Sequence, residues 1–506
     1  MIAAACLLAS CALQQTGPLP PRKAPLGANI EGIADWMRSM PFADVMKSAR
    51  SFGKPDQPWV AISNLDAQGW PKEDFGVVLF AALNGVKGLG GTYKVSFKSS
   101  GTPQIKAVAS SANITNLKRT GDTWTADMIP PNEFEQIMLS FTGTNGGVRD
   151  LKIMRPGTQP TDTFYKPFLD HVRRFTTIRY MDWGSTNGNR LEKWEDRPTL
   201  STPSFSGPKG VAYEIMIDLS NTIKADAWIC IPAHANDQYV KNLAELCKKR
   251  LDPSLKLYVE YSNEVWNWSF EQATYNMNMA NADAAKDPKM SWDGQGSKWT
   301  WPARRIGKRT AEISDTFKAV YGADFKSKVR PVLCTQVVWP ENWLYEGMNY
   351  IAHNYSKPNE VIYAIAGAPY FNVEEAKKKP NATKDDMLNA LDKVVDEMPK
   401  WAKFKEHQDV MKKYGVKWLC YEAGPDTFGP EHIQAKKASQ LDPRMEQIML
   451  KYWRTWRSSG GELMNYFIAG ATNYDGQYGT WGLTDDLTKT DTPKIRAIDA
   501  ILNGKQ

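Results

Sequence analysis

This chain of 506 residues has few cysteines and lacks the sequence motifs of several enzyme classes. The six cysteines form neither a CxxC pair nor a Cys/His cluster, so no disulfide framework and no metal site is indicated. A GxSxG elbow, an HExxH helix and a P-loop are also missing, which leaves serine hydrolases, metallopeptidases and nucleotide-binding enzymes without support. The Gly-rich stretch 85–91 does not open a helix and gives no dinucleotide fingerprint.

Beyond the N-terminus, no apolar run is long enough to span a membrane. Segment 1–11 is apolar but short, and it resembles the end of an export signal without the usual basic residues. Residues 8–11 (LASC) resemble a bacterial lipobox, in which a lipid on Cys11 would attach the protein to a membrane. The alternative is a soluble secreted protein whose signal is cut nearby. We therefore expect 1–25 to be an export signal and Pro-rich tether, and the protein to be periplasmic, an outer-membrane lipoprotein or extracellular.

Blocks of like charge are absent too, although the net charge is +7. A nucleic-acid-binding protein concentrates its Lys and Arg residues on one face or tail, so we expect no nucleic-acid partner. Aromatic residues, in contrast, are abundant, with 19 Trp and 20 Tyr. They either build a large core or form exposed platforms for sugar rings, which bind flat apolar surfaces with a polar edge.

From residue 164 onward, helical spacing alternates with short apolar runs, the pattern of βα units around a parallel sheet. Strands are predicted at 26–31, 176–181, 225–232, 256–261, 329–336, 361–367, 416–421 and 462–468. Helices are predicted at 42–51, 210–223, 237–251, 304–321, 341–354, 385–413 and 445–457. Eight strands alternating with helices favour a closed (β/α)8 TIM barrel over an open doubly wound sheet.

Between the first two barrel strands, the sequence changes to short alternating runs separated by Gly, Ser, Thr, Asn and Pro. Strands are predicted there at 77–82, 92–98, 105–109, 123–128 and 136–141, which is typical of an antiparallel β-sandwich. We expect the barrel to begin over 26–59, a sandwich domain to be inserted after the first strand over 60–156, and the barrel to continue over 157–506. The sandwich either binds sugar or braces the barrel.

Two carboxylates follow predicted barrel strands. Glu264 follows the fourth strand and Glu422 ends the seventh, so both should lie on the C-terminal rim where barrel enzymes place their active groups. A charged carboxylate near a barrel core is costly unless it has a partner or a purpose. Retaining glycoside hydrolysis needs such a pair, with one carboxyl protonated to assist the leaving oxygen and the other ionised to attack the anomeric carbon.

This pattern resembles glycoside hydrolase clan A, and within it the family-five cellulase and mannanase type. Its hallmark is Asn-Glu after the fourth strand and a single Glu at the end of the seventh, which Asn263-Glu264 and Glu422 match. The resemblance implies that Glu264 is the acid/base, Glu422 the nucleophile and Asn263 the donor to the sugar 2-hydroxyl. Val265 stands where family five commonly has Pro, and the insertion after the first strand is unusual for the family.

The resemblance also implies supporting roles. Arg179 in the second strand would hydrogen-bond the nucleophile, with Glu260 as its partner; a purely structural ion pair is the alternative. His234 would line the subsite of the cleaved sugar, or is only a turn residue. Tyr370 would contact the nucleophile, and Trp481 would be a sugar platform or would pack against the rim.

We therefore predict a retaining β-glycoside hydrolase acting on a β-linked glucan, mannan or similar polysaccharide, with no metal or organic cofactor implied. Tryptophans near strand ends suggest a long cleft and endo-action: Trp183, Trp266, Trp268, Trp339 and Trp343. The alternative is a non-catalytic carbohydrate-binding surface protein, and the chain as a whole also resembles secreted bacterial proteins loosely labelled cellulose-binding. A pure binder has no need for the carboxylate pair.

Overall fold

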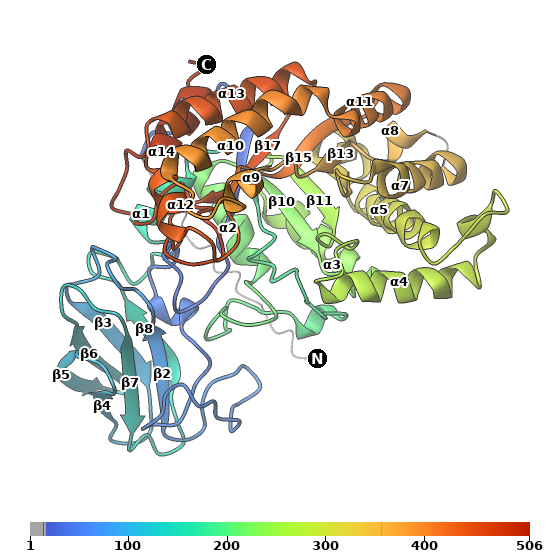
Figure 1. Cartoon of the computed structure of the whole chain (residues 1–506). Helices are drawn as coiled ribbons and strands as arrows, with labels where there is room; N and C mark the ends of the chain where they lie inside the picture. The colour runs from blue at the N-terminus through green and yellow to red at the C-terminus, as the bar shows by residue number, and fades with distance from the viewer. Residues whose placement is uncertain (1–13, 15–16, 356, 506) are drawn as a thin grey trace, which may run out of the picture.

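The computed structural model describes residues 14, 17–355 and 357–505, and Cys11 lies outside them. Eight parallel strands close into a barrel in the order β1-β17-β15-β13-β12-β11-β10-β9 (Figure 1). They are β1 Leu26–Ile30, β9 Thr177–Arg179, β10 Asp226–Ile231, β11 Leu257–Tyr261, β12 Val329–Cys334, β13 Ala364–Gly367, β15 Lys417–Ala423 and β17 Met464–Ala469. All eight lie at predicted positions, so the prediction of a (β/α)8 barrel is confirmed.

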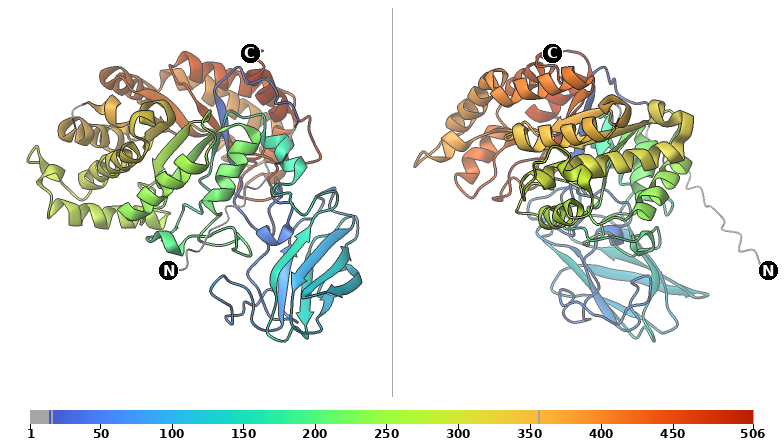
Figure 2. Two further views of the ribbon diagram at one scale, coloured as in Figure 1. Left: turned by 180° about the vertical axis from the view of Figure 1, so that it is seen from behind. Right: turned by 90° about the vertical axis from the view of Figure 1, so that its right-hand side faces the viewer.

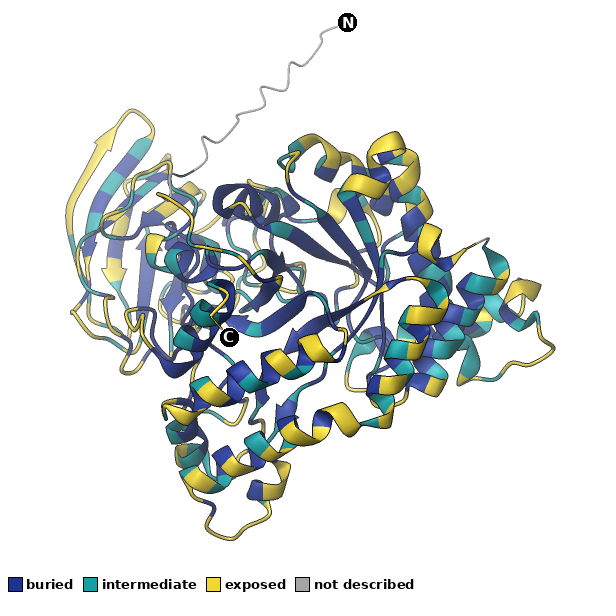
Figure 3. Cartoon of the chain, turned by 90° about the horizontal axis from the view of Figure 1, so that it is seen from above, coloured by how far each residue is buried: buried dark blue, intermediate teal, exposed yellow. Residues whose placement is uncertain are grey.

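The barrel strands are mostly apolar because helices cover their outer faces. Every residue of β1, β11 and β13 is buried, and Figure 3 shows the strands as a buried centre inside helices with exposed outer faces. The longer helices are α2 Tyr213–Ile223, α3 Asp237–Arg250, α4 Glu271–Ala284, α5 Thr300–Tyr321, α7 Pro340–Asn354, α10 Lys384–Glu397, α11 Ala402–Tyr414, α12 Ile433–Gln440, α13 Arg444–Ser458 and α14 Pro493–Leu502. Shorter ones are α1 Lys166–Val172, α6 Phe325–Lys328, α8 Pro358–Val361 and α9 Glu374–Lys377.

Two helix predictions are wrong. The segment predicted as a helix at 42–51 holds only a 3₁₀ turn, Val45–Ser48, because Asp44 is drawn into other contacts. The Asp44 carboxylate accepts a hydrogen bond from the backbone N–H of Ile153 at 2.9 Å, so tertiary pairing overrides the helical spacing. The single helical stretch predicted at 385–413 is divided into α10 and α11 around Pro399, whose ring does not fit a helix interior.

Two antiparallel sheets lie near the N-terminus, in chain order between β1 and β9. One has the order β2-β7-β4 and the other β5-β6-β3-β8; the strands are β2 Phe75–Phe80, β3 Tyr93–Lys98, β4 Gln104–Ala107, β5 Asn113–Thr120, β6 Thr123–Ile129, β7 Ile137–Thr142 and β8 Arg149–Met154. Phe97 of one sheet contacts Phe141 of the other with ring centroids 5.5 Å apart, so their inner faces share a core. The sheets stand beside the barrel in both views of Figure 2.

The segment before β1 lies against the barrel. The backbone N–H of Lys23 donates to the carbonyl of Leu502 in α14 at 2.8 Å, and the Arg22 guanidinium donates to the carbonyl of Ile223 at the end of α2. The last residues of the predicted tether are therefore fixed to the barrel. No helix of the described residues is long and apolar enough to cross a membrane.

Candidate active site

Arg179 organises the carboxylates at the C-terminal rim of the barrel. It is the last residue of β9 and is completely buried. Its Nε and Nη2 donate to both oxygens of Glu260 at 2.9 Å, its Nη2 donates to Asn263 at 2.8 Å, and its Nη1 donates to Asn29 at 3.0 Å and to Glu422 at 2.7 Å. All five N–H groups of the guanidinium are thus used, which fixes four side chains relative to one another.

Glu260 is buried inside β11 and receives further donors. The indole Nε1 of Trp228 donates to Glu260 Oε2 at 2.7 Å, and the Cys230 thiol donates to the same oxygen at 3.2 Å. A buried carboxylate with this many donors and a bidentate Arg partner remains in place rather than meeting a substrate. Glu260 therefore holds the Arg179 guanidinium in position.

Glu422 is the second-to-last residue of β15 and is almost completely buried. Its Oε1 accepts from Arg179, and its Oε2 accepts from the Tyr370 hydroxyl at 2.9 Å. The pKa of Glu422 is raised to about 7, chiefly by burial and also by the nearby carboxyl of Glu264, although Arg179 and Tyr370 lower it. Because both donors favour the ionised form, they oppose the cost of burying this charge.

Glu264 lies three residues beyond β11, in a turn with strained backbone. Its φ is +40°, and Ser262 has a φ of +57°, a region that residues other than glycine rarely adopt. The Glu264 carboxylate accepts from Asn267 at 2.9 Å and from the Tyr421 hydroxyl at 3.3 Å. The charge of the Glu264 carboxyl raises the pKa of Glu422, so the two carboxyls lie close enough at the rim to interact. Strain of this kind is concentrated at functional sites.

Asn263 connects the carboxylates to the loop after β9. Its side-chain oxygen accepts from Arg179, and its Nδ2 donates to Asn187 Oδ1 at 3.0 Å. Gln272 at the start of α4 donates to the same oxygen of Asn187 at 2.7 Å and to the carbonyl of Asn263 at 2.8 Å. Asn29, Asn187 and Gln272 are site residues that the sequence analysis missed. Asn29 had a signal, because it is the polar residue in an otherwise apolar strand.

Trp481 lies beside Tyr370, in the loop after β17. The two rings are 5.4 Å apart between centroids, which puts Trp481 one aromatic ring away from Glu422. The loop is held by the buried amino group of Lys494, which donates to the carbonyls of Thr480 at 2.5 Å and Gly482 at 3.1 Å. Trp481 is half-buried, with the ring of Tyr370 beside it and its loop held by Lys494.

His234, in contrast, is not brought to the Arg179 cluster. It follows β10, its ring stacks on Tyr275 at 3.7 Å between centroids, and its Nε2 lies 3.2 Å from the Glu271 carboxylate. His234 thus has its own partners in the loop layer. Of the eight predicted site residues, the other seven lie in or beside one connected network at the barrel rim: Arg179, Glu260, Asn263, Glu264, Tyr370, Glu422 and Trp481.

The predicted tryptophans divide into two groups. Trp268 and Trp339 are 48% and 47% exposed, and Trp299, which was not predicted, is 46% exposed. Trp266 and Trp343 are buried, at 6% and 3% exposure. Trp183 is completely buried against Phe42 and Phe168, so its ring is not an exposed sugar platform. The position of Trp183 after the second strand predicted its place near the C-terminal rim, but not that its side chain would be buried.

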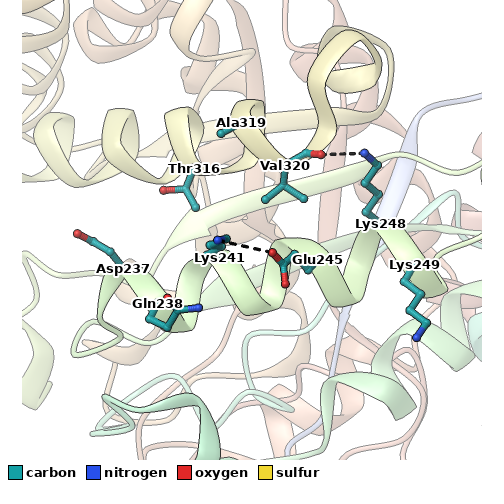
Figure 4. Close-up of a pocket in the computed structure, with 9 residues that line it drawn as sticks. All are labelled: Asp237, Gln238, Lys241, Glu245, Lys248, Lys249, Thr316, Ala319 and Val320. Carbon is teal, nitrogen blue, oxygen red and sulfur yellow. Dashed lines mark hydrogen bonds and ion pairs between the residues drawn. The ribbon is translucent and has the colours of Figure 1, made fainter. Parts of the chain in front are cut away.

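A wide recess also exists on the outer layer of helices, away from the carboxylates (Figure 4). It has a volume of about 990 Å³ and lies between α3 and α5, lined by Lys241, Glu245, Lys248 and Val320 among others. Lys248 donates to the carbonyl of Val320 at 2.8 Å, and Lys241 lies 4.0 Å from Glu245. These groups satisfy one another on an open surface, so they suggest no chemistry.

The thiols in the described part of the chain are free and buried at Cys230, Cys247, Cys334 and Cys420, as predicted. Within the same residues, no group of three or more His, Cys, Asp or Glu side chains could hold a metal ion. The chemistry available at the rim is therefore that of two carboxyls, one held by donors to both oxygens and one in a strained turn beside it.

No family model matches this sequence, and no curated protein matches it either. Solved structures match distantly: the GH51 arabinofuranosidase of Xanthomonas axonopodis pv. citri has 13% identity over 69% of this chain and 67% of its own, with a TM-score of 0.44. The CBM22-1–GH10 modules of Clostridium thermocellum xylanase 10B have 11% identity over 94% and 97%, with a TM-score of 0.35. Xylanase 10C of Cellvibrio japonicus has 12% identity over 87% and 95%, with a TM-score of 0.36. TM-scores this low assign no family, so function has to be argued from this chain's own residues.

Proposed function

We propose that this protein is a retaining β-glycoside hydrolase that acts on a β-linked polysaccharide, with Glu264 as acid/base and Glu422 as nucleophile. The observation that carries the proposal is the pair of donors on Glu422: Arg179 on one oxygen and Tyr370 on the other. Such donors orient a carboxylate for attack and favour its ionised form.

In the first step, the Glu264 carboxyl donates its proton to the glycosidic oxygen while Glu422 attacks the anomeric carbon. The bond from that carbon to the leaving oxygen breaks, the leaving sugar departs with the proton, and an ester joins the glycone to Glu422. In the second step, Glu264 takes a proton from water, whose oxygen attacks the anomeric carbon and releases Glu422. Two inversions at one carbon retain its configuration.

The exposed tryptophans support endo-action on a long chain. Trp268 and Trp299 contact each other at 6.0 Å between ring centroids, and Trp339 contacts Trp343 at 6.4 Å. The buried ring of Trp343 in turn contacts the buried ring of Trp266, which lies 6.3 Å from that of Tyr421 beside the catalytic pair. These rings follow β11 and β12, on the side of Glu264, where the leaving sugar would extend.

The alternative function is a non-catalytic carbohydrate-binding protein, which the same exposed tryptophans would serve. Export, and attachment through a lipid on Cys11, remain parts of the proposal.

The functional test compares the wild type with Glu422→Ala on β-glucans, mannans and xylans, with both proteins shown to be folded. Cleavage by the wild type alone is the expected result and names the substrate. Binding without turnover by either protein would favour the non-catalytic alternative.

A further inference from the structure

A recess of about 350 Å³ opens at the rim, on the side of the barrel opposite to Trp268, Trp299 and Trp339, which follow β11 and β12. The loops that follow β1 and β9 line it, and its polar lining includes Glu31, Asp182 and Asn187. Asn187 accepts hydrogen bonds from Asn263 and Gln272, so the recess is continuous with the catalytic network. Asp182 is also close enough to raise the pKa of Glu422 by its charge.

The two carboxyl groups in this recess pair with no cation in its wall, and only Glu31 has hydrogen-bond donors among the described residues. Asp182 makes no side-chain hydrogen bond or ion pair with any of the residues that the structure describes. Glu31 accepts a hydrogen bond from the backbone N–H of Ser39 at 3.1 Å, and the Ser39 hydroxyl and the Arg38 backbone N–H also lower its pKa, yet it pairs with no cation in that part of the chain. Burial raises the pKa of Glu31 to about 7 despite its donors, and it raises that of Asp182 to about 6 against the opposing charge of Arg179.

The rest of the lining also supplies no positive charge. No Lys, Arg or His is among the described residues that form the wall of the recess. Trp36 lies at its edge and is 57% exposed, with the Arg50 guanidinium 5.9 Å from the ring centroid, so an aromatic ring stands beside the two carboxyls. An aromatic surface next to unsatisfied acceptors suits a sugar ring, which has an apolar face and an edge of hydrogen-bond donors.

We propose that this recess holds the sugar residue on the glycone side of the cleaved bond, and that it takes a sugar with hydroxyl or amine donors and excludes one that carries a carboxylate. This inference rests on the proposed function, because it uses the sides of the bond that Glu422 and Glu264 define. A hydroxyl or ammonium group would give Asp182 the donor that it lacks and would add a donor beside Glu31. A uronate would instead place a third carboxylate beside them, where Arg179 is already shared between Glu260 and Glu422 and the described wall of the recess supplies no further cation.

The test measures binding in the full chain, so that turnover is not needed for a signal. Calorimetry on Glu264→Gln uses neutral gluco-, manno- and xylo-oligosaccharides, the same sugars carrying a uronic acid at the nonreducing end, and glucosamine oligosaccharides. Neutral or amine-bearing oligosaccharides are expected to bind, and those with a terminal uronic acid are not. Adding Asp182→Asn should weaken the favoured ligand about tenfold, the loss expected for one hydrogen bond to a charged group.

Two further variants keep the test decisive. Glu31→Gln should weaken the same ligand if Asp182→Asn fails to fold, whereas Asp237→Asn, an exposed acid in the recess between α3 and α5, should change nothing. Tight binding of the uronic-acid ligand, or no effect of either carboxyl substitution, would overturn the inference. If the wild type cleaves its substrate and Asp182→Asn cleaves it equally well, only this inference is refuted. Binding that depends on Asp182, in a protein that cleaves nothing, would refute the proposed function alone.

Discussion

Arg179 and Glu422 form a buried ion pair with 2.7 Å between Nη1 and Oε1, and the remaining N–H groups of Arg179 are all engaged by Glu260, Asn263 and Asn29. The Arg179 guanidinium is thus shared between two buried carboxylates, Glu260 and Glu422. Only the carboxylate of Glu422 lies at the open rim. Arg179 fixes the position of the Glu422 carboxylate, and Glu260 in turn fixes the position of the Arg179 guanidinium. This relationship carries the mechanism and yields the predictions below.

Arg179→Met should destabilise the fold strongly. It would leave Glu260 and Glu422 buried without a cation, and removing one partner of a buried ion pair costs about 3–5 kcal/mol. Arg179→Lys keeps the charge but loses the fork of donors, so it should be more stable than Arg179→Met and still lose most activity. Denaturant unfolding and kcat on the best polysaccharide measure the two effects. Equal stability of Arg179→Met and wild type would show that the ion pair is not buried as described.

Tyr370→Phe should move the acidic limb of the pH profile. Activity requires ionised Glu422, so kcat/KM falls as the pH drops through the pKa of Glu422, about 7. The Tyr370 hydroxyl lowers that pKa by donating to the ionised carboxylate, and its removal should shift the limb to higher pH. Tyr239→Phe, which removes a buried hydroxyl between α2 and α3, is the matched control. A limb that stays in place in both variants would contradict this role.

Glu422→Gln should change how stability depends on pH. The pKa of Glu422 is raised from 4.5 to about 7 by folding, so the folded wild type binds more protons than the unfolded chain between these values and loses stability as pH rises through them. The variant lacks this loss, so its free energy of unfolding relative to wild type should increase from pH 4.5 to 7. Urea unfolding across that range measures the difference. A constant difference would show that the pKa is not raised.

The exposed tryptophans should matter for long substrates only. Trp268→Ala and Trp339→Ala each remove one sugar platform worth about 1 kcal/mol, so KM for the polysaccharide should rise about fivefold. Hydrolysis of a small aryl β-glycoside should be unchanged. Trp59→Ala, which removes a Trp that is 49% exposed outside the barrel rim, serves as control. Equal losses on both substrates, or monosaccharide as the sole early product, would contradict endo-action.

The barrel could be predicted from sequence because parallel strands buried on both faces appear as continuous apolar runs. The sandwich was predicted less completely. Strand β5 has almost no buried residue, so its sequence carries no alternation, and it was missed together with β8. The helix predicted at 42–51 failed for a different reason, because Asp44 is held by Ile153, a partner 109 residues away that local spacing does not reveal.

The site could be predicted where its residues end or follow strands. Glu422, Glu264 and Arg179 do so, and counting strands was enough to bring them to one rim. Asp182 and Asn187 come from the loop after β9, and Gln272 comes from the start of α4. Loops fold against one another through tertiary contacts, so sequence spacing did not indicate that Asn187 and Gln272 would meet Asn263.

The most direct test of the central claim is to trap the glycosyl-enzyme. A 2-deoxy-2-fluoro glycoside with a good leaving group, built on the sugar that the substrate panel identifies, slows the second step more than the release of its leaving group, and peptide mass spectrometry then locates the ester. We predict one sugar attached to Glu422, and no label in Glu422→Ala. A label on Glu264, or one-step inversion with no covalent intermediate during full turnover, would contradict the proposed mechanism.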